Sequence, residues 1–177
     1  MGEVVELGYG KALKADKRNL GSVPVYGSNG HIGWHDQALV EGPGIVVGRK
    51  GNPGIVTWVP TSFYPIDTTF YVLPKNTDFS LYYLYFALTR LDLQRLGADS
   101  AVPGLNRHSV YGSQIVLPPS RVSSVFDRSC RELFGRVFLN ETENRTLATT
   151  RDTILPKLLS GEIRVPADEV TVAEDLA

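Results

Sequence analysis

The first 75 residues of the chain alternate short apolar runs with glycine, proline and asparagine. Short runs that are rich in β-branched residues and bounded by turn residues are typical of β-strands. Between these runs lie residues 26–30 and 48–54, which are rich in residues that tolerate positive φ and therefore predict tight loops. The predicted strands are residues 23–26, 45–47, 55–59 and 69–73.

A helical pattern begins at residue 80. Ser80 is a favourable helix N-cap, and the length and apolar content of residues 81–88 predict a buried helix. Residues 97–107 then predict a loop. Residues 113–117 predict one more strand, which ends at Pro118 because proline cannot donate a hydrogen bond to a sheet.

After Pro119 the pattern becomes that of one long helix. Residues 121–155 contain no proline and a single glycine, and apolar side chains recur in alternating steps of four and three residues. This heptad spacing is typical of coiled coils, and a helix of about 35 residues is about 50 Å long. Pro156 is expected to end or kink the helix and to begin a short turn that ends at Gly161. The positions of this heptad seam are Phe126, Cys130, Leu133, Val137, Asn140, Asn144, Leu147, Arg151, Ile154 and Leu158.

The heptad seam requires a surface to pack against. Seven of its ten positions are apolar, and burying one large apolar side chain contributes about 1.5–3 kcal/mol. Because so long a helix extends beyond the body that precedes it, we expect an intermolecular helical partner and hence a homodimer. The alternative is that the seam packs against the chain's own domain. Asn140 and Asn144 are typical of polar positions that fix the register of a coiled coil.

The net charge does not by itself indicate a nucleic-acid-binding protein. The chain has 18 Lys and Arg against 19 Asp and Glu, which gives −1. Residues 1–120 hold ten basic against nine acidic residues, residues 121–164 eight against six, and residues 165–177 none against four. An acidic tail therefore masks a mildly basic body, and any argument for nucleic-acid binding must rest on local clusters.

The composition favours a cytoplasmic protein. Cys130 is the single cysteine, which excludes a disulfide within one chain and favours a reducing compartment. The first residues show neither a basic start nor a long apolar run, so no signal peptide is expected. Nowhere do about 18 apolar residues run together, so no membrane span is expected either.

Six segments together resemble the target recognition domains of specificity subunits in type I restriction–modification systems. They occur in the order typical of that family and cover nearly the whole chain. Each segment alone is a weak signature of the family, and the six together are a specific one. A full specificity subunit has two such units in tandem, whereas this chain has one unit and no internal repeat. It therefore resembles either the second half of a subunit or a natural half-subunit that must pair with a copy of itself. The segments are residues 23–33 (VPVYGSNGHIG), 42–54 (GPGIVVGRKGNPG), 67–72 (DTTFYV), 100–107 (SAVPGLNR), 117–119 (LPP) and 155–163 (LPKLLSGEI).

The resemblance implies a fold and a set of partners. The fold would be an α/β (α+β) recognition domain with mixed or antiparallel strands over residues 1–119, a long coiled-coil-forming helix over residues 120–162, and a flexible acidic tail over residues 163–177. The partners would be double-stranded DNA, methyltransferase subunits that dock on the helix, and a restriction–translocase subunit in the complete complex. Each recognition domain would read one half of an interrupted target, with the helices setting the spacing.

Basic and donor-rich residues on predicted loops are the candidate DNA contacts. Arg49 and Lys50 place two cations on a tight loop, where arginine suits guanine O6 and N7 and either residue suits phosphate. The loop is not a P-loop, because Arg49 stands where that motif requires its second glycine. For every candidate the alternative is a solvated loop or a residue that only forms the turn. The candidates are Lys11, Lys14, Tyr26, Ser28, Asn29, His31, Arg49, Lys50, Asn52, Asn106 and Arg107.

No enzymatic chemistry is expected from this chain. It has no glycine-rich adenosylmethionine loop, no Asn/Asp-Pro-Pro-Tyr/Phe motif and no Ser-His-Asp pattern. His31 and His35 lie in a turn-rich segment without a neighbouring cysteine, so neither a metal nor another cofactor is expected. Cys130 is interpreted as a small buried residue of the seam.

Two alternative functions remain open. The chain could be the specificity partner of a combined restriction–methylation enzyme outside type I, or a coiled-coil interaction protein without DNA-reading activity. DNA binding by variants of Arg49 and Lys50 distinguishes the second alternative from the recognition hypothesis.

Overall fold

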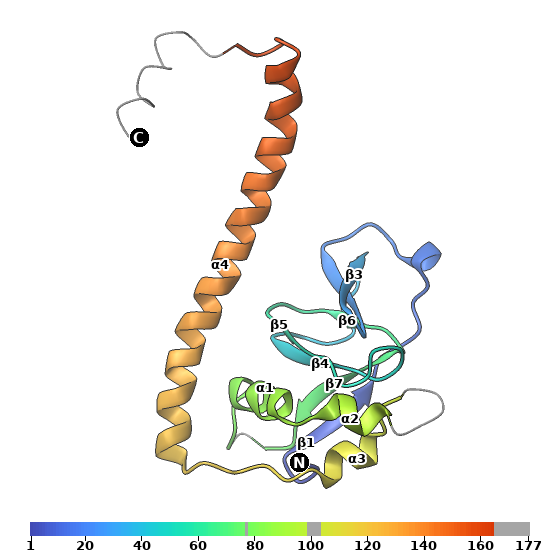
Figure 1. Ribbon diagram of the computed structural model, residues 1–177, viewed down its shortest axis with the longest axis vertical. Coiled ribbons are helices and arrows are strands. Elements are labelled where there is room, and N and C mark those ends of the chain that lie inside the picture. The colour runs from blue at the N-terminus through green and yellow to red at the C-terminus, as the bar shows by residue number, and fades with distance from the viewer. Residues whose placement is uncertain (77, 99–103, 165–177) are drawn as a thin grey trace. The chain divides into compact units, whose positions relative to one another are not determined.

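The computed structural model describes residues 1–76, 78–98 and 104–164, and the chain forms two compact units, Met1–Arg131 and Glu132–Ala177 (Figure 1). The first unit contains both β-sheets and the short helices, and the second contains most of the long helix α4 (Ser120–Leu159). Among the described residues, no helix combines the length and the apolar character needed to cross a lipid bilayer.

The larger sheet has the antiparallel strand order β1-β7-β4-β5. All five residues of β4 are buried, which explains why its sequence is continuously apolar instead of alternating. The pairing of β1 with β7 sets Tyr9 opposite Phe70. The four strands are β1 (Val5–Tyr9), β4 (Gly44–Gly48), β5 (Val56–Val59) and β7 (Thr69–Pro74).

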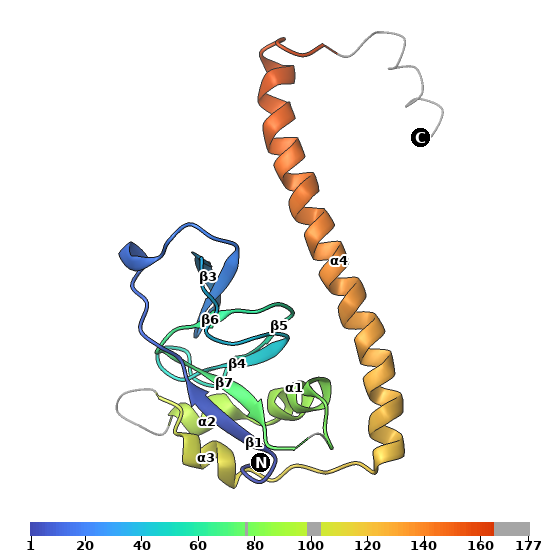
Figure 2. The same ribbon diagram turned by 180° about the vertical axis from the view of Figure 1, so that it is seen from behind.

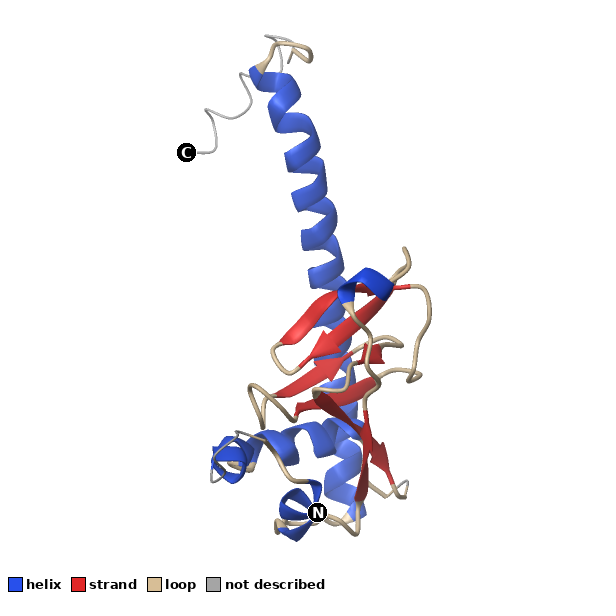
Figure 3. Cartoon of the chain, turned by 90° about the vertical axis from the view of Figure 1, so that its right-hand side faces the viewer, coloured by secondary structure: helices blue, strands red, loops and turns tan. Residues whose placement is uncertain are grey.

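The smaller sheet has the order β3-β2-β6. β2 (Val23–Gly27) and β3 (Gly30–His35) form an antiparallel hairpin with the two-residue turn Ser28-Asn29, and β2 pairs in parallel with β6 (Tyr64–Pro65). Gly30 follows the turn with φ of +96°, a conformation that residues with a side chain rarely adopt. Figure 3 shows this sheet at the end of the first unit opposite the labelled N-terminus.

The short α-helices α1 (Leu81–Arg90), α2 (Leu93–Ala98) and α3 (Arg107–Gly112) gather at one end of the first unit (Figures 1 and 2). The Ser80 hydroxyl accepts a hydrogen bond from the Tyr83 N–H at 3.2 Å, which confirms the predicted N-cap of α1. A further 3-10 turn, η1, covers Ala15–Lys17.

The main core lies between the larger sheet and these helices. It joins residues such as Leu7 and Phe70 of the strands to Leu84 of α1 and Val110 of α3, all almost completely buried. A smaller cluster of Val46, Val59 and Phe63 is packed against Tyr26 of the smaller sheet. Burial of these side chains gives the first unit a hydrophobic core of its own.

The long helix α4 has 40 residues and is about 60 Å long. Its first turns belong to the first unit. Ser123 and Cys130 are buried there, and Phe126 meets Phe86 of α1 edge to face with ring centroids 5.7 Å apart. The Ser80 hydroxyl also donates to the Asp127 carboxylate, which joins the cap of α1 to α4.

Of the two effects expected of Pro156, an end or a kink of the helix, the structure excludes the end. Pro156 lies inside α4, which continues to Leu159 before Gly161 adopts φ of +76°. The proline removes only the hydrogen bond that its own nitrogen would donate, and the Ser160 N–H still donates to the Pro156 carbonyl at 3.0 Å. A proline this close to the end of a helix interrupts little of the hydrogen-bond ladder.

The predicted strand at residues 113–117 is wrong, because this segment has no regular structure. Its carbonyl groups accept hydrogen bonds from other donors: the Ser113 oxygen from the Met1 ammonium at 2.6 Å, and the Val116 oxygen from the Tyr83 hydroxyl. Burial raises the pKa of that hydroxyl above its usual value, which keeps Tyr83 a donor. The segment therefore crosses the domain without a strand beside it.

The other predicted elements are largely confirmed. All four strands predicted before residue 75 are present within one residue of β2, β4, β5 and β7, and the helix at residues 81–88 is α1. The predicted loop at residues 97–107 is only partly a loop, because α2 ends at Ala98 and α3 begins at Arg107; residues 99–103 lie outside the described residues. β1, β3 and β6 were not predicted.

Candidate nucleic-acid interface

The loop between β4 and β5 carries Arg49, Lys50 and Asn52. The N–H groups of Arg49 and Lys50 both donate to the Thr68 carbonyl, at 2.8 and 3.1 Å, so the loop is tied to the turn before β7. Gly48 is required at the base of the loop, because a Cβ there would lie 2.3 Å from the Asn52 carbonyl oxygen. The predicted tight loop is therefore confirmed, and its backbone is held independently of its outward side chains.

The β2–β3 turn is bound to this loop through its side chains. The Ser28 hydroxyl lies 2.5 Å from the Lys50 carbonyl oxygen and 2.7 Å from the Thr68 carbonyl oxygen. The Asn52 amide donates to the Asn29 side-chain oxygen. Two segments that are about 20 residues apart in the sequence thus form one continuous surface.

The segment before α3 joins the same surface. The Leu105 N–H donates to the Arg49 carbonyl at 2.8 Å, and Lys50 forms a β-bridge with Gly104. Asn106 is the N-cap of α3, where its side-chain oxygen accepts from the His108 N–H at 2.8 Å. Helix capping therefore uses one of the two lone pairs of that oxygen, and the other lone pair and the amide nitrogen of Asn106 are left for a ligand.

Arg107 extends this surface towards Arg49. Its guanidinium carbon lies 5.0 Å from the centre of the Tyr9 ring, and that of Arg49 lies 5.1 Å from the same centre. Arg49 also donates to the Asp67 carbonyl at 2.8 Å. We call the predicted residues that the structure brings together the loop cluster: Ser28, Asn29, Arg49, Lys50, Asn52 and Arg107.

The loop cluster carries three positive charges. Within the described residues, none of its Lys and Arg side chains forms an ion pair with a carboxylate. Lys50 is exposed, and Arg49 and Arg107 are partly buried. Three cations without a carboxylate partner, next to two exposed amide side chains, form a surface that is suited to a polyanion with hydrogen-bonding edges.

Four other predicted contact residues, Tyr26, His31, Lys11 and Lys14, make contacts of other kinds. Tyr26 and His31 form an aromatic group of their own with Trp34 of β3, in which the rings of His31 and Trp34 are 4.7 Å apart. The Lys11 N–H donates to the Pro65 carbonyl at 3.1 Å and its side chain is exposed, and Lys14 caps η1.

The seam of α4 divides at the boundary of the two units. Phe126 and Cys130 pack within the first unit, so the alternative of packing against the chain's own domain holds for this part. Burial, and then the nearby Asp127 carboxylate, raise the pKa of the Cys130 thiol above its usual value, which disfavours the nucleophilic thiolate. In the second unit Leu133 is 63% exposed, and the other apolar seam positions are exposed as well: Val137, Leu147, Ile154 and Leu158.

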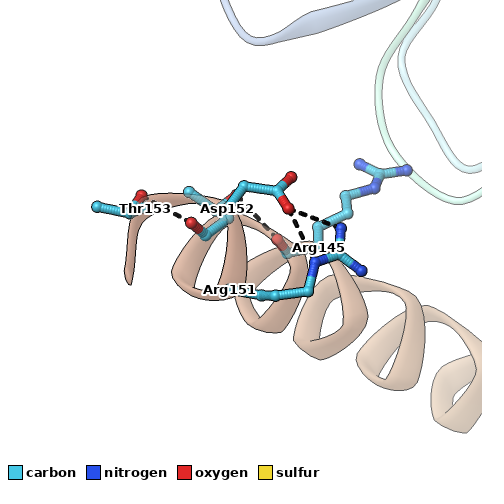
Figure 4. Close-up of polar contacts among 5 residues, drawn as sticks. Arg145, Arg151, Asp152 and Thr153 are labelled. Carbon is cyan, nitrogen blue, oxygen red and sulfur yellow. Dashed lines mark hydrogen bonds and ion pairs between the residues drawn. The ribbon is translucent and has the colours of Figure 1, made fainter. Parts of the chain in front are cut away.

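The polar seam position Arg151 is paired within its own helix. Figure 4 shows its guanidinium against the Asp152 carboxylate, with nitrogen–oxygen distances of 2.8 Å. On the same turns the hydroxyl of Thr153 donates to the Thr149 carbonyl, and that of Thr149 to the Arg145 carbonyl. An exposed pair of this kind contributes little to stability, but it neutralises the charge that Arg151 brings to the seam.

An apolar groove lies beside the start of α4 in the first unit. It has a volume of about 610 Å³ and is lined by residues that include Phe86, Val116, Val122 and Phe126. Phe126 closes one side of it through its contact with Phe86.

Sequence reasoning missed Tyr9, Asp67 and Thr68, which organise the loop cluster. The last two act through their backbone carbonyls, which give no signal in a sequence. Tyr9 precedes a glycine and a lysine and could have been noticed as an aromatic residue beside a basic one. Its contact with Arg107 depends on the fold alone.

Comparison with protein families gives one match over the first unit. The family model described as "Type I restriction modification DNA specificity domain" matches residues 1–122. Among curated proteins, the specificity subunit of the type I restriction enzyme HindI from Haemophilus influenzae is 29% identical over 97 residues, or 52% of this chain and 21% of that protein. The MjaIX specificity subunit from Methanocaldococcus jannaschii is 28% identical over 87 residues, or 48% of this chain and 20% of that protein. The chain thus matches about a fifth of the length of these relatives.

Solved structures show the same fold. The type I restriction–modification S subunit from M. genitalium superposes with a TM-score of 0.71 at 22% identity, over 89% of this chain and 44% of that one. The HsdS subunit from Thermoanaerobacter tengcongensis gives a TM-score of 0.54 at 13% identity, over 92% of this chain and 44% of that one. The predicted fold, mixed and antiparallel strands followed by a long helix, is confirmed by this similarity.

Proposed function

The chain belongs to the type I restriction–modification DNA specificity family, and from this premise we propose that its first unit reads one half of an interrupted duplex DNA target through the loop cluster. The observation that carries the proposal is the convergence of Arg49 and Lys50, on the β4–β5 loop, with Arg107 at the start of α3, none of which has a carboxylate partner among the described residues. A DNA duplex supplies both the negative charge and the hydrogen-bonding edges that such a surface requires.

The members of the loop cluster have different roles in this proposal. Lys50, the exposed cation, contacts phosphate and orients the domain on the duplex. The side-chain amides of Asn29 and Asn52 form one hydrogen bond with each other, which uses one donor of Asn52 and one acceptor of Asn29. Their remaining donors and acceptors face base edges. Ser28 holds the turn in place through the carbonyl groups of Lys50 and Thr68 and does not read bases.

The test is selection of bound duplexes from a random pool at near-physiological salt, with and without the cognate methyltransferase subunit. Two short fixed half-sites at a constant spacing are expected, and a palindrome if the protein is a homodimer. A folded protein that enriches no sequence even with the methyltransferase subunit would contradict the proposal and favour an interaction protein without DNA-reading activity.

We also propose that the chain supplies recognition and leaves catalysis to its partner subunits. In the complete complex these would be methyltransferase subunits docked on α4 and a restriction–translocase subunit. Methyl transfer from adenosylmethionine to DNA by the purified chain alone would contradict this division of labour.

The exposed part of the seam supports a homodimer through α4. Between residues 133 and 158 the seam presents five apolar side chains, which are exposed in the single chain. Apolar positions at heptad spacing pack when a second helix covers them. The polar positions Asn140 and Asn144 lie between them and would set the register.

Charged substitutions in the seam test the dimer. Leu133→Asp combined with Ile154→Asp is expected to give monomers, measured as mass by light scattering after size exclusion. Leu139→Asp is the matched control, because Leu139 is 66% exposed on the same helix but lies outside the seam. If the double variant keeps the mass of the wild type, the seam is not the interface.

A further inference from the structure

Tyr9, at the end of β1, contacts both arginines of the loop cluster. The guanidinium carbons of Arg49 and Arg107 lie 5.1 and 5.0 Å from the centre of its ring, which is within the range of a cation–π interaction. The ring itself is held by Phe70, at 5.1 Å between centroids, and remains 48% exposed. One exposed aromatic ring therefore holds two cations from segments about 60 residues apart.

The two guanidinium groups are close to each other, and neither has a neutralising carboxylate among the described residues. Since each lies about 5 Å from one point, their carbons are no more than about 10 Å apart, roughly one Debye length at physiological salt. Within the described residues neither forms an ion pair, and the buried Nε atoms of both donate no hydrogen bond. Arg49 uses one terminal nitrogen on the Asp67 carbonyl. Two guanidinium groups in this arrangement repel each other unless an external anion lies beside them.

The ring holds these cations without occupying their donors. A cation–π interaction is electrostatic attraction to the face of the ring and uses no N–H group. Arginine in such a contact therefore keeps its N–H donors for a phosphate, which it can bind in a bidentate manner. The backbone restrains Arg49 as well, since its N–H and carbonyl are both hydrogen-bonded, to Thr68 and Leu105.

We propose that Tyr9 is a positioning residue for DNA binding, which holds Arg49 and Arg107 as a pair that contacts neighbouring phosphates of the duplex. This inference rests on the proposed function and assigns the pair a role in backbone contact instead of base reading. It adds to the recognition domain a residue whose effect on DNA operates only through the two arginines.

The test compares Tyr9→Leu with Tyr9→Phe in the full chain. Affinity is measured by fluorescence anisotropy for a labelled duplex carrying the selected target and for one of scrambled sequence, at several salt concentrations. Loss of two exposed cation–π contacts is expected to weaken binding roughly 5- to 30-fold on both duplexes. Tyr9→Phe keeps the ring and is expected to bind within about 2-fold of the wild type.

A double-mutant cycle separates positioning from a general effect on folding. Arg107→Ala is measured in the wild type and in Tyr9→Leu, with urea unfolding of each variant as the check of stability. If Tyr9 positions Arg107, then Arg107→Ala costs less affinity in the Tyr9→Leu background than in the wild type. An equal cost in both backgrounds, or wild-type affinity in Tyr9→Leu, would overturn the role of Tyr9.

Two further outcomes distinguish failure of this inference from failure of the proposed function. If Tyr9→Leu weakens binding to the selected duplex alone, the pair reads bases and the phosphate assignment is wrong. If the wild type binds neither duplex, with or without the methyltransferase subunit, the proposed function itself fails. Normal wild-type binding with an unaffected Tyr9→Leu contradicts only the positioning role.

Discussion

Phe126 attaches the start of α4 to the first unit, and its removal should destabilise that unit in a way that can be calculated. The side chain is 36% exposed, so about two thirds of it is removed from water, mainly by packing at Phe86. A fully buried Phe→Ala substitution costs about 3–5 kcal/mol, so Phe126→Ala should lower the free energy of unfolding by about 2–3 kcal/mol. With a urea m-value of about 1–3 kcal/mol/M for a small domain, the midpoint falls by about 0.7–3 M.

Tryptophan fluorescence during urea unfolding is the suitable assay. The two tryptophans of the chain, Trp34 and Trp58, both lie in the first unit, so the signal reports on that unit. Val125→Ala is the matched control, because Val125 is adjacent, 59% exposed, and its replacement should change the free energy by less than about 0.5 kcal/mol. All variants are compared at one protein concentration, since dimerisation would contribute to stability.

Equal midpoints for Phe126→Ala and Val125→Ala would refute this reasoning. That result would mean that the first turns of α4 add nothing to the stability of the first unit and that the contact with Phe86 is not maintained in solution. A fall confined to Phe126→Ala would instead establish that the recognition domain includes the beginning of the helix.

Three other outcomes can be measured on the same protein. Ser28→Ala removes the hydroxyl that lies within hydrogen-bond distance of the Lys50 and Thr68 carbonyl oxygens, so it should lower the free energy of unfolding by about 1 kcal/mol and weaken DNA binding. Unchanged binding would show that the turn is held by the backbone alone. Arg49→Ala with Lys50→Ala should reduce the slope of log affinity against log salt by about 2 without loss of folding, and an unchanged slope would remove this loop from the interface. Burial, and then the Asp127 carboxylate, raise the pKa of the Cys130 thiol. The thiol should therefore react with iodoacetamide far more slowly at pH 8 in the native protein than in urea, and equal rates would show that it is accessible.

The elements predicted from the sequence are those that can be identified from their own residues, without knowledge of the segments they pair with. The runs that form β4 and β5 are apolar and bounded by glycine, and Ser80 caps α1 as its sequence indicates. The heptad spacing predicted α4 as far as Leu158, and Pro156, which was expected to end or kink the helix, does not end it.

Elements that depend on long-range pairing were missed. β1 is interrupted by Gly8, and its strand partner β7 begins 60 residues after β1 ends. β3 contains Gly33 and looks like a turn, but pairing with β2 makes it a strand. Conversely, residues 113–117 have the composition of a strand and no strand beside them.

The same distinction applies to the loop cluster. Arg49, Lys50 and Arg107 are conspicuous as cations on glycine-rich segments, so they could be proposed from the sequence. That Arg49 and Arg107 meet at Tyr9 follows from the register of β1 on β7, which sets Tyr9 opposite Phe70, and no local pattern carries that information.

The loops of the first unit are joined largely through main-chain atoms, and this has a consequence for how readily the protein could be retargeted. The carbonyls of Arg49, Lys50, Asp67 and Thr68 all accept cross-loop hydrogen bonds, and every amino acid carries such a group. Variation of Asn29 or Asn52 would remove their mutual side-chain hydrogen bond but would leave these carbonyl hydrogen bonds in place. A combinatorial library confined to these tips, with Ser28 and Gly48 kept, would explore new target preferences on one unchanged scaffold.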